Sequence, residues 1–252
     1  MTKPTARPTK YRFTLLLGFL LAASPLAAQE EDPDQGLSLL FIGNSLTYTN
    51  DLPDMLASLL EWGGVRVDRI ETEARPDFGL PDHWLSKTTM RAIGSHDWDY
   101  VIFQQGPSAT EGRPYLLEYS ELFAVEIRKA GARPALFMVW PSAQRLRDFP
   151  GVADSYRTAA RDVDGLLLPA GEAWMLAWQR DPKLRLYGRD GFHPSRLGTY
   201  LAALVIYQAL TQLDPRELPP LIPGKVSPDE LPEELASLLQ EAAVEANAGE
   251  MP

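Results

Sequence analysis

The hydrophobic positions of this chain recur with two different spacings, and each spacing predicts one kind of element. Short apolar runs, such as LSLLFI at 37–42, are typical of strands buried on both faces of a sheet, whereas the alternating stretch 65–74 is typical of a half-exposed strand. The strands predicted in this way occupy 37–42, 65–74, 100–106, 134–140 and 165–171.

Between these runs, apolar residues recur at the spacing of amphipathic helices. In DLPDMLASLLEW at 51–62 they share one face, and Gly63 and Gly64 end the helix. Strands that alternate with helices through short loops predict a parallel sheet covered on both faces, so the expected fold is a three-layer α/β/α sandwich with a five-stranded, flavodoxin-like sheet. The predicted helices cover 51–62, 80–92, 114–130, 151–162, 172–180, 196–211 and 228–245.

The two ends of the chain differ in composition from its centre. Residues 1–28 begin with basic side chains, continue with an apolar run at 13–23 and finish with small residues, the order found in a secretory signal peptide. The apolar run is shorter than the roughly 20 residues of a membrane span, and an uncleaved signal anchor is the alternative. We expect a polar leader at 29–36, one α/β domain at 37–212, and a Pro-rich linker with a C-terminal amphipathic helix at 213–252.

Composition and charge restrict the partners of this chain. A signal peptide predicts a secreted or periplasmic protein, and the absence of cysteine excludes both a disulfide framework and a lipid-modified cysteine. Cleavage after residue 28 would remove four basic residues and no acidic ones, leaving 20 Lys and Arg against 34 Asp and Glu, a formal charge of −14. Such a surface disfavours nucleic acid and anionic membranes as partners, and the sequence does not specify an oligomeric state.

Polar side chains follow the predicted strands at the points where the strands end. Asn44 and Ser45 come after the first strand, Gln104 and Gln105 end the third, and His193 lies in the last loop before an apolar helix. Because ligands bind beyond the carboxyl ends of parallel strands, near the point where strand order reverses, we expect these segments to share one crevice. The loops 75–90, 107–114 and 141–150 are expected to shape the pocket, with Asn44 and Trp140 as candidate lining residues.

The sequence DGFHPS places a carboxylate three residues before an imidazole. At this spacing Asp190 can accept the ring N–H of His193 and orient the other ring nitrogen outward, and Pro194 restricts the backbone of His193 to an extended form. The outward nitrogen would take the proton of Ser45 as its hydroxyl attacks an acyl carbon. Ser45, Asp190 and His193 are therefore the candidate catalytic triad.

A hydrolytic triad needs donors for the oxyanion that forms during attack. The backbone N–H of Ser45 and that of Gly79, after the second strand, are candidates, together with the side-chain amide of Gln104 or Gln105. Neighbouring strand residues face opposite sides, so the two glutamines cannot both enter the pocket unless the strand has already ended. We favour Gln104 narrowly.

These motifs resemble those of the SGNH or GDSL-like hydrolase superfamily over residues 37–212. FIGNSLTYTNDLP is similar to its first block, with Gly43-Asn44-Ser45 in place of G-D-S, and DGFHPS is similar to its last block. The middle blocks depart from the common pattern, since only Gly79 is available for the second and VIFQQGPS replaces the usual G-x-N-D of the third. Some carbohydrate-esterase branches are similar in using Gln there. The resemblance implies an esterase or lipase-type acyl hydrolase without metal or organic cofactor, acting on carboxylic esters that include acetylated sugars.

Other functions find less support in the residues. Three scattered histidines without cysteine disfavour a zinc site, and a second and third glycine of a dinucleotide fingerprint are missing after Gly43. His83 is expected to be structural, and His96 to lie in a surface turn. Two alternatives stay open: a non-catalytic extracellular glycan-binding module on the same fold, and an acyltransferase that uses the same triad.

Overall fold

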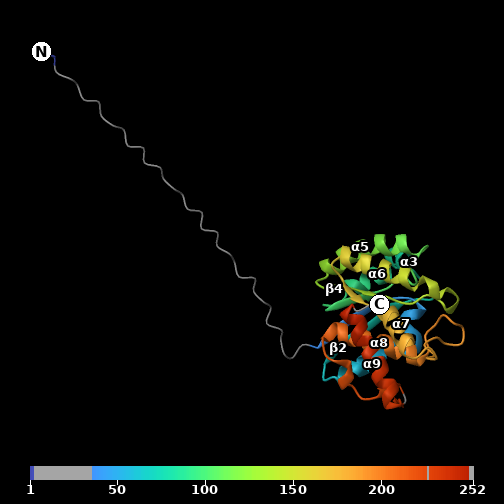
Figure 1. Ribbon diagram of the computed structural model, residues 1–252. Coiled ribbons are helices and arrows are strands. Elements are labelled where there is room, and N and C mark those ends of the chain that lie inside the picture. Colours follow the sequence, from blue (N-terminus) through green and yellow to red (C-terminus); the bar gives the residue numbers. More distant parts are fainter. Residues whose placement is uncertain (3–35, 226, 250–252) are drawn as a thin grey trace. The chain divides into compact units, whose positions relative to one another are not determined.

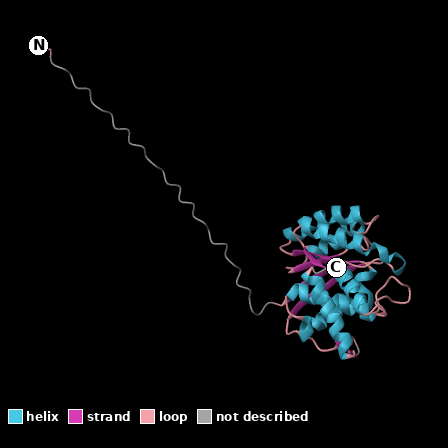
Figure 2. Ribbon diagram, in the orientation of Figure 1, coloured by secondary structure: helices cyan, strands magenta, loops and turns pink. Residues whose placement is uncertain are grey.

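The computed structural model describes residues 1–2, 36–225 and 227–249. In these residues the central sheet holds five parallel strands in the order β2-β1-β3-β4-β5, which confirms the predicted α/β class and its five-stranded parallel sheet (Figures 1 and 2). The strands form because their apolar runs are covered on both faces, and Leu39 to Ile42 of β1 have no exposed surface. Their bounds are β1 (Leu37–Gly43), β2 (Val67–Ala74), β3 (Tyr100–Phe103), β4 (Arg133–Phe137) and β5 (Leu166–Leu168).

Helices cover both faces of the sheet (Figure 1). On one face α2 packs against α8, and α9 packs against both α7 and α8; on the other face α5 packs against α3 and α6. The helices are α1 (Ser45–Tyr48), α2 (Leu52–Trp62), α3 (Leu80–Leu85), α4 (Lys87–Ile93), α5 (Arg113–Lys129), α6 (Phe149–Asp162), α7 (Ala170–Arg180), α8 (Arg196–Thr211) and α9 (Glu233–Ala248), with short 3-10 turns at Thr49–Asp51, Ala143–Asp148 and Pro215–Glu217.

The order of the strands reverses at β1, which pairs with both β2 and β3. Phe41 of β1 lies opposite Thr72 of β2 and Ile102 of β3, so the carboxyl ends of the three strands are adjacent. A crevice at such a switch point is where sheets of this kind bind ligands. The segments that follow β1, β2 and β3 therefore meet at one edge of the sheet.

Several predicted elements differ from the observed ones. The strand expected at 134–140 ends at Phe137 as β4, and the helix expected at 228–245 begins at Glu233 as α9. The single helix expected at 80–92 is two helices, because Ser86 has an extended backbone and its hydroxyl accepts the N–H of Thr89 as the cap of α4. β3 ends at Phe103, so Gln104 and Gln105 already lie beyond the strand. β5 ends at Leu168, and the residues expected to continue it begin α7.

The segment expected to be a linker and a C-terminal helix forms a small ribbon and a packed helix. β6 (Leu221–Ile222) pairs antiparallel with β7 (Asp229–Glu230). α9 buries Leu239 and neighbouring alanines, and the side-chain amide of Asn247 donates to the carbonyl of Val205 in α8 at 3.1 Å. This helix therefore shares the hydrophobic core of the sandwich.

The predicted signal peptide and polar leader lie outside the described residues, apart from Met1, Thr2 and Gly36. Among the residues that the structure does describe, no helix combines the length and the apolar character needed to cross a membrane.

Candidate active site

Ser45 is the first residue of α1, directly beyond β1. The turn that carries it is fixed by Asn44, whose backbone is extended and whose side-chain oxygen accepts the N–H of Leu46 at 3.1 Å. Gly43, the last residue of β1, has no space for a side chain, because a Cβ there would lie 2.3 Å from the hydroxyl oxygen of Thr47. The nucleophile candidate thus sits on a closely packed junction between strand and helix.

The loop before α8 brings His193 to this junction. The distance from His193 Nε2 to Ser45 Oγ is 2.9 Å, and that from His193 Nδ1 to Asp190 Oδ2 is 2.5 Å. The carboxylate can only accept a hydrogen bond, so Nδ1 of His193 carries the proton. Nε2 then accepts a hydrogen bond from the hydroxyl of Ser45. The structure therefore brings the three predicted triad residues together in the order Ser45, His193, Asp190.

The other oxygen of Asp190 shapes the loop itself. Oδ1 accepts the backbone N–H groups of Phe192 and His193, each at 3.0 Å, which closes a turn around Gly191 with its positive φ of 69°. The hydrogen bond from His193, followed by that from the Phe192 N–H, lowers the pKa of Asp190 to about 2. Although Asp190 is exposed, its carboxylate stays ionised at neutral pH and holds the ring of His193.

Two further side chains, those of Trp140 and Asn50, hold the loop by donating hydrogen bonds to its carbonyl groups. The indole Nε1 of Trp140 donates to the carbonyl of Phe192 at 3.1 Å. On the other side, the amide of Asn50 donates to the carbonyl of Pro194 and to the hydroxyl of Thr199, both at 2.9 Å. Asn50 has a left-handed backbone, with φ of 57° and ψ of 25°. From this conformation its side chain reaches from the turn after Ser45 to the loop that carries His193.

The expected oxyanion donors differ in whether they already take part in a hydrogen bond. No hydrogen bond of the Ser45 N–H occurs within the described part of the chain. The N–H of Gly79, in contrast, donates to Asp82 Oδ2 at 2.9 Å. The Gln105 side chain lies against Gly79, since a Cβ on that glycine would be 2.7 Å from Gln105 Nε2, while Gln105 Oε1 accepts the N–H of Leu80 at 2.7 Å.

The hydrogen bonds of the two glutamines do not support the narrow preference for Gln104 over Gln105. Gln104 is fully buried, and its Nε2 donates to Asn44 Oδ1 at 2.8 Å and to Thr47 Oγ1 at 3.3 Å. Both N–H groups of its amide are therefore engaged beneath the Ser45 turn, and neither can bind an oxyanion. Gln105 uses its oxygen to hold Leu80 and leaves its amide nitrogen beside Gly79.

Asn44 and Trp140, the two candidate pocket residues, do not line the cavities described below. Besides capping α1, Asn44 donates from Nδ2 to the carbonyl of Phe78 at 3.0 Å. Its polar atoms therefore connect the segments that follow β1, β2 and β3. Trp140 is fully buried and stacks on Trp174, with ring centroids 3.8 Å apart. Both residues support the site from within the protein.

His83 is buried, as expected for a structural residue. Its Nε2 lies 2.8 Å from the carbonyl oxygen of Gly43, and its Nδ1 lies 3.0 Å from the hydroxyl of Thr89. Burial, the largest influence, lowers its pKa, so the ring is neutral. His96 is exposed, and its Nε2 lies 3.4 Å from a carboxylate oxygen of Glu71.

A small cavity lies beside the His193 loop, with Phe192 in its wall. Its other walls come from Val152 of α6 and from the loops after β3 and β4, which the sequence predicted to shape the pocket. Arg145 bridges these loops, with Nε donating to Asp148 at 2.5 Å and a guanidinium N–H donating to Thr110 at 3.2 Å. The cavity measures about 210 Å³ and is lined by Pro107, Ala109, Glu111, Pro141, Ser142, Arg145, Asp148, Val152 and Phe192.

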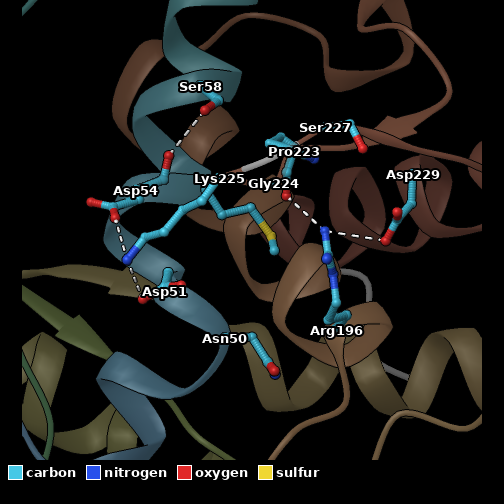
Figure 3. Close-up of a pocket in the computed structure, with 11 residues that line it drawn as sticks. Asn50, Asp51, Asp54, Ser58, Arg196, Pro223, Gly224, Lys225, Ser227 and Asp229 are labelled. Carbon is cyan, nitrogen blue, oxygen red and sulfur yellow. Dashed lines mark hydrogen bonds and ion pairs between the residues drawn. The ribbon is translucent and has the colours of Figure 1, made fainter.

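A second cavity, of about 490 Å³, lies between α2, the start of α8 and the segment around β7 (Figure 3). Its charged side chains are paired with one another: Lys225 contacts Asp51 at 2.9 Å, and Arg196 contacts Asp229 at 3.2 Å. Asn50 lines this cavity and donates to the carbonyl of Pro194 in the His193 loop, and none of the three triad residues lines either of the two cavities. Within the described residues, no group of three or more His, Cys, Asp or Glu side chains could hold a metal ion.

Comparison with solved structures identifies similar folds. A candidate SGNH hydrolase from Slackia heliotrinireducens matches with 26% identity and a TM-score of 0.61, covering 70% of this chain and 100% of that one. A DUF4886 family protein from Bacteroides uniformis matches with 20% identity and a TM-score of 0.69, covering 84% and 95%. An acetyl xylan esterase matches with 14% identity and a TM-score of 0.56, covering 69% and 100%.

No protein-family model matches the sequence, and no curated protein matches it. The sheet order, together with these structures, confirms the resemblance to the SGNH/GDSL-like hydrolase superfamily. At this level the similarity supports a hydrolase of that superfamily. Several of the matched structures are described as esterases or lipases.

Proposed function

We propose that this chain is a serine ester hydrolase in which Ser45 is the nucleophile, His193 the general base and acid, and Asp190 the residue that orients and charge-stabilises the imidazole. The observation that carries the proposal is the continuous hydrogen-bond chain from Ser45 Oγ through the ring of His193 to Asp190 Oδ2, with distances of 2.9 and 2.5 Å. A turn serine and a loop histidine without a shared reaction have no need for this alignment.

The reaction follows from this geometry. As Ser45 Oγ attacks the ester carbonyl carbon, its proton passes to His193 Nε2, and the carbonyl π electrons move to the oxygen. The imidazolium, stabilised by Asp190, then gives the proton to the leaving alcohol oxygen as its bond to carbon breaks. Water repeats the two steps on the acyl-enzyme, returning a carboxylic acid and the free hydroxyl of Ser45.

The oxyanion needs donors at the carboxyl end of β1. The Ser45 N–H and the Gln105 amide are the donors that this arrangement favours, since the Gln104 amide is engaged elsewhere. The Gly79 N–H can join them once Asp82 releases it, and Asp82 is exposed enough to turn away.

For the substrate, we propose short acyl esters, with acetylated sugars as the first class to test. The cavity beside Phe192 is small, about 210 Å³, and carries two carboxylates against one guanidinium in its lining. Such a site accommodates a short acyl group or part of a neutral sugar more readily than an anionic one. The chain's similarity in fold to an acetyl xylan esterase is consistent with this class.

We also propose that the protein is secreted or periplasmic, with residues 1–28 removed as a signal peptide. The test is N-terminal sequencing of the chain recovered from outside the cytoplasm of an expression host. We expect it to begin close after residue 28, and a chain retained in the cytoplasm with an intact start would contradict export.

A fluorophosphonate probe tests the enzyme proposal directly, because it forms a covalent bond only with an activated serine. We expect labelling of the wild type, no labelling of Ser45→Ala, and full labelling of Ser58→Ala, a matched control at a half-buried position of α2 whose hydroxyl donates to the Asp54 carbonyl and contacts none of the triad. A folded wild type that resists the probe would refute the serine-nucleophile assignment and favour a glycan-binding module. A panel of acetylated sugars and of esters with short and long acyl chains then defines the substrate, and transfer of the acyl group to a sugar in place of water would identify an acyltransferase.

A further inference from the structure

The buried imidazole of His83 belongs to no step of the proposed reaction, yet both of its nitrogens are hydrogen-bonded beside the site. The carbonyl of Gly43 can only accept, so the proton of the ring is on Nε2, and Nδ1 accepts from the hydroxyl of Thr89. Edge-to-face contact with the ring of Phe78, at 5.1 Å between centroids, fixes the plane of the imidazole. The ring therefore has one tautomer and one orientation.

This imidazole connects two segments that carry expected oxyanion donors. Gly43 ends β1, two residues before Ser45, and His83 lies in α3, which starts directly after Gly79. At its first residue, α3 is held by a second contact, from the Leu80 N–H to Gln105 Oε1 at 2.7 Å. Through α3, the position of the Gln105 amide is coupled to the position of the Ser45 turn.

The hydrogen bond from His83 is not needed to satisfy a buried carbonyl. The oxygen of Gly43 also accepts the backbone N–H of Arg75 at 3.0 Å, so it keeps a partner if the imidazole is removed. What the imidazole adds is a fixed distance between β1 and α3. An apolar side chain of similar size could fill the same space without fixing that distance.

We propose that His83 is a positioning residue for the oxyanion site, which sets the separation between the Ser45 N–H and the donors around Gly79 and Gln105. The proposal rests on the proposed serine hydrolase function. Because donors act on the transition state and hardly on the bound substrate, the loss of this contact reduces kcat and leaves KM nearly unchanged. A displacement of donors by about 1 Å can lower the rate by about 100-fold.

Three variants separate positioning from packing. His83→Leu fills the space and has no donor, His83→Gln retains an amide N–H that reaches the place of Nε2, and Thr89→Val removes the partner that fixes the tautomer. Each is compared with the wild type by its thermal midpoint, by kcat and KM for 4-nitrophenyl acetate, and by the rate of labelling with a fluorophosphonate. The labelling rate responds to the same donors, because the probe also passes through a state with negative charge on oxygen.

We expect His83→Leu to lose about 100-fold in kcat and in labelling rate, with KM changed less than about threefold, and His83→Gln to stay within about tenfold of the wild type. Thr89→Val should lose about fivefold in kcat, far less than His83→Leu, since a single hydrogen bond is worth about 1 kcal/mol. Rescue by glutamine is the readout that a purely structural role would not give.

Several outcomes would overturn the assignment. A folded His83→Leu enzyme that keeps a third or more of the wild-type kcat excludes a positioning role, and so does a His83→Gln enzyme as impaired as His83→Leu. If His83→Leu does not fold, a Thr89→Val enzyme with unchanged kcat, or a folded His83→Gln enzyme that has lost about 100-fold, overturns it instead. A wild type that neither hydrolyses esters nor binds the probe would remove the proposed function itself, which is a distinct result from an active enzyme indifferent to His83.

Discussion

The pH dependence of stability should be dominated in one range by Glu172, a carboxyl group in the first turn of α7. Its residue is 1% exposed, and Oε1 has no hydrogen-bond partner in the described residues. The guanidinium of Arg157 contacts Oε2 at 2.8 Å. Burial nevertheless raises the pKa of Glu172 from 4.5 to about 7, and the positive charge of Arg157 opposes this rise only in part.

The sign of the effect follows from proton binding. Between pH 4.5 and about 7 the folded chain keeps the Glu172 proton and the unfolded chain has lost it, so the free energy of unfolding decreases as the pH rises through this range. The stabilisation is fully present below pH 4.5 and is lost by the time the pH passes the folded pKa. The gap between the two pKa values corresponds to about 3 kcal/mol.

Glu172→Gln removes this titration and therefore isolates it. We expect the thermal midpoint of the wild type, measured relative to that of Glu172→Gln at each pH by calorimetry or circular dichroism, to fall by about 6–12 °C between pH 4 and pH 8. The lost contact with Arg157 shifts the whole difference by a constant and does not change its slope. Glu234→Gln, at an exposed position in α9, is the matched control and should run parallel to the wild type. Parallel midpoint curves for the wild type and Glu172→Gln would refute the reasoning.

Three further predictions concern the active site. Asp190→Asn should lower kcat for 4-nitrophenyl acetate by about 10⁴-fold with little change in KM, because the imidazole loses the acceptor that fixes its tautomer; a loss below tenfold in steady-state kinetics would contradict the triad. Gln105→Ala should lower kcat by about 100-fold and lower the thermal midpoint less than Gln104→Ala does, since it loses one hydrogen bond, from the Leu80 N–H, whereas Gln104→Ala breaks two buried ones; the reverse pattern would restore Gln104 as the oxyanion residue. Gly43→Ala places a Cβ 2.3 Å from Thr47 Oγ1 and should cost about 1–3 kcal/mol in chemical denaturation, and an unchanged midpoint would show that the junction can relax.

The sheet and the triad candidates could be predicted from the sequence because their signals are local. The apolar run of β1 and the D-x-x-H spacing each specify their own geometry, and the switch-point rule then places Ser45 and His193 in one crevice. The fold prediction is confirmed, and the structure brings the three triad residues within hydrogen-bond distance.

The parts that sequence reasoning missed depend on contacts between distant segments. Gln104 and Gln105 are neighbours of the same type, and only the places of Asn44 and Gly79 in the folded chain decide which amide is engaged. Trp140 follows a strand, as a pocket residue would, but stacking on Trp174 keeps it inside. The break of the helix at Ser86 was a local signal, since serine is a common cap, and could have been recognised.

The hydrogen bonds of Asn50 have a consequence for protein engineering. By joining Pro194 and Thr199 to the turn that follows Ser45, this side chain ties together stretches of backbone separated by more than 140 positions. Transplanting the DGFHPS segment onto another scaffold would therefore transfer its sequence without the hydrogen bonds that hold the segment in place. A graft that also included Asn50 and Trp140, which hold this segment through Pro194 and Phe192, should reproduce the alignment of the serine, histidine and aspartate far better.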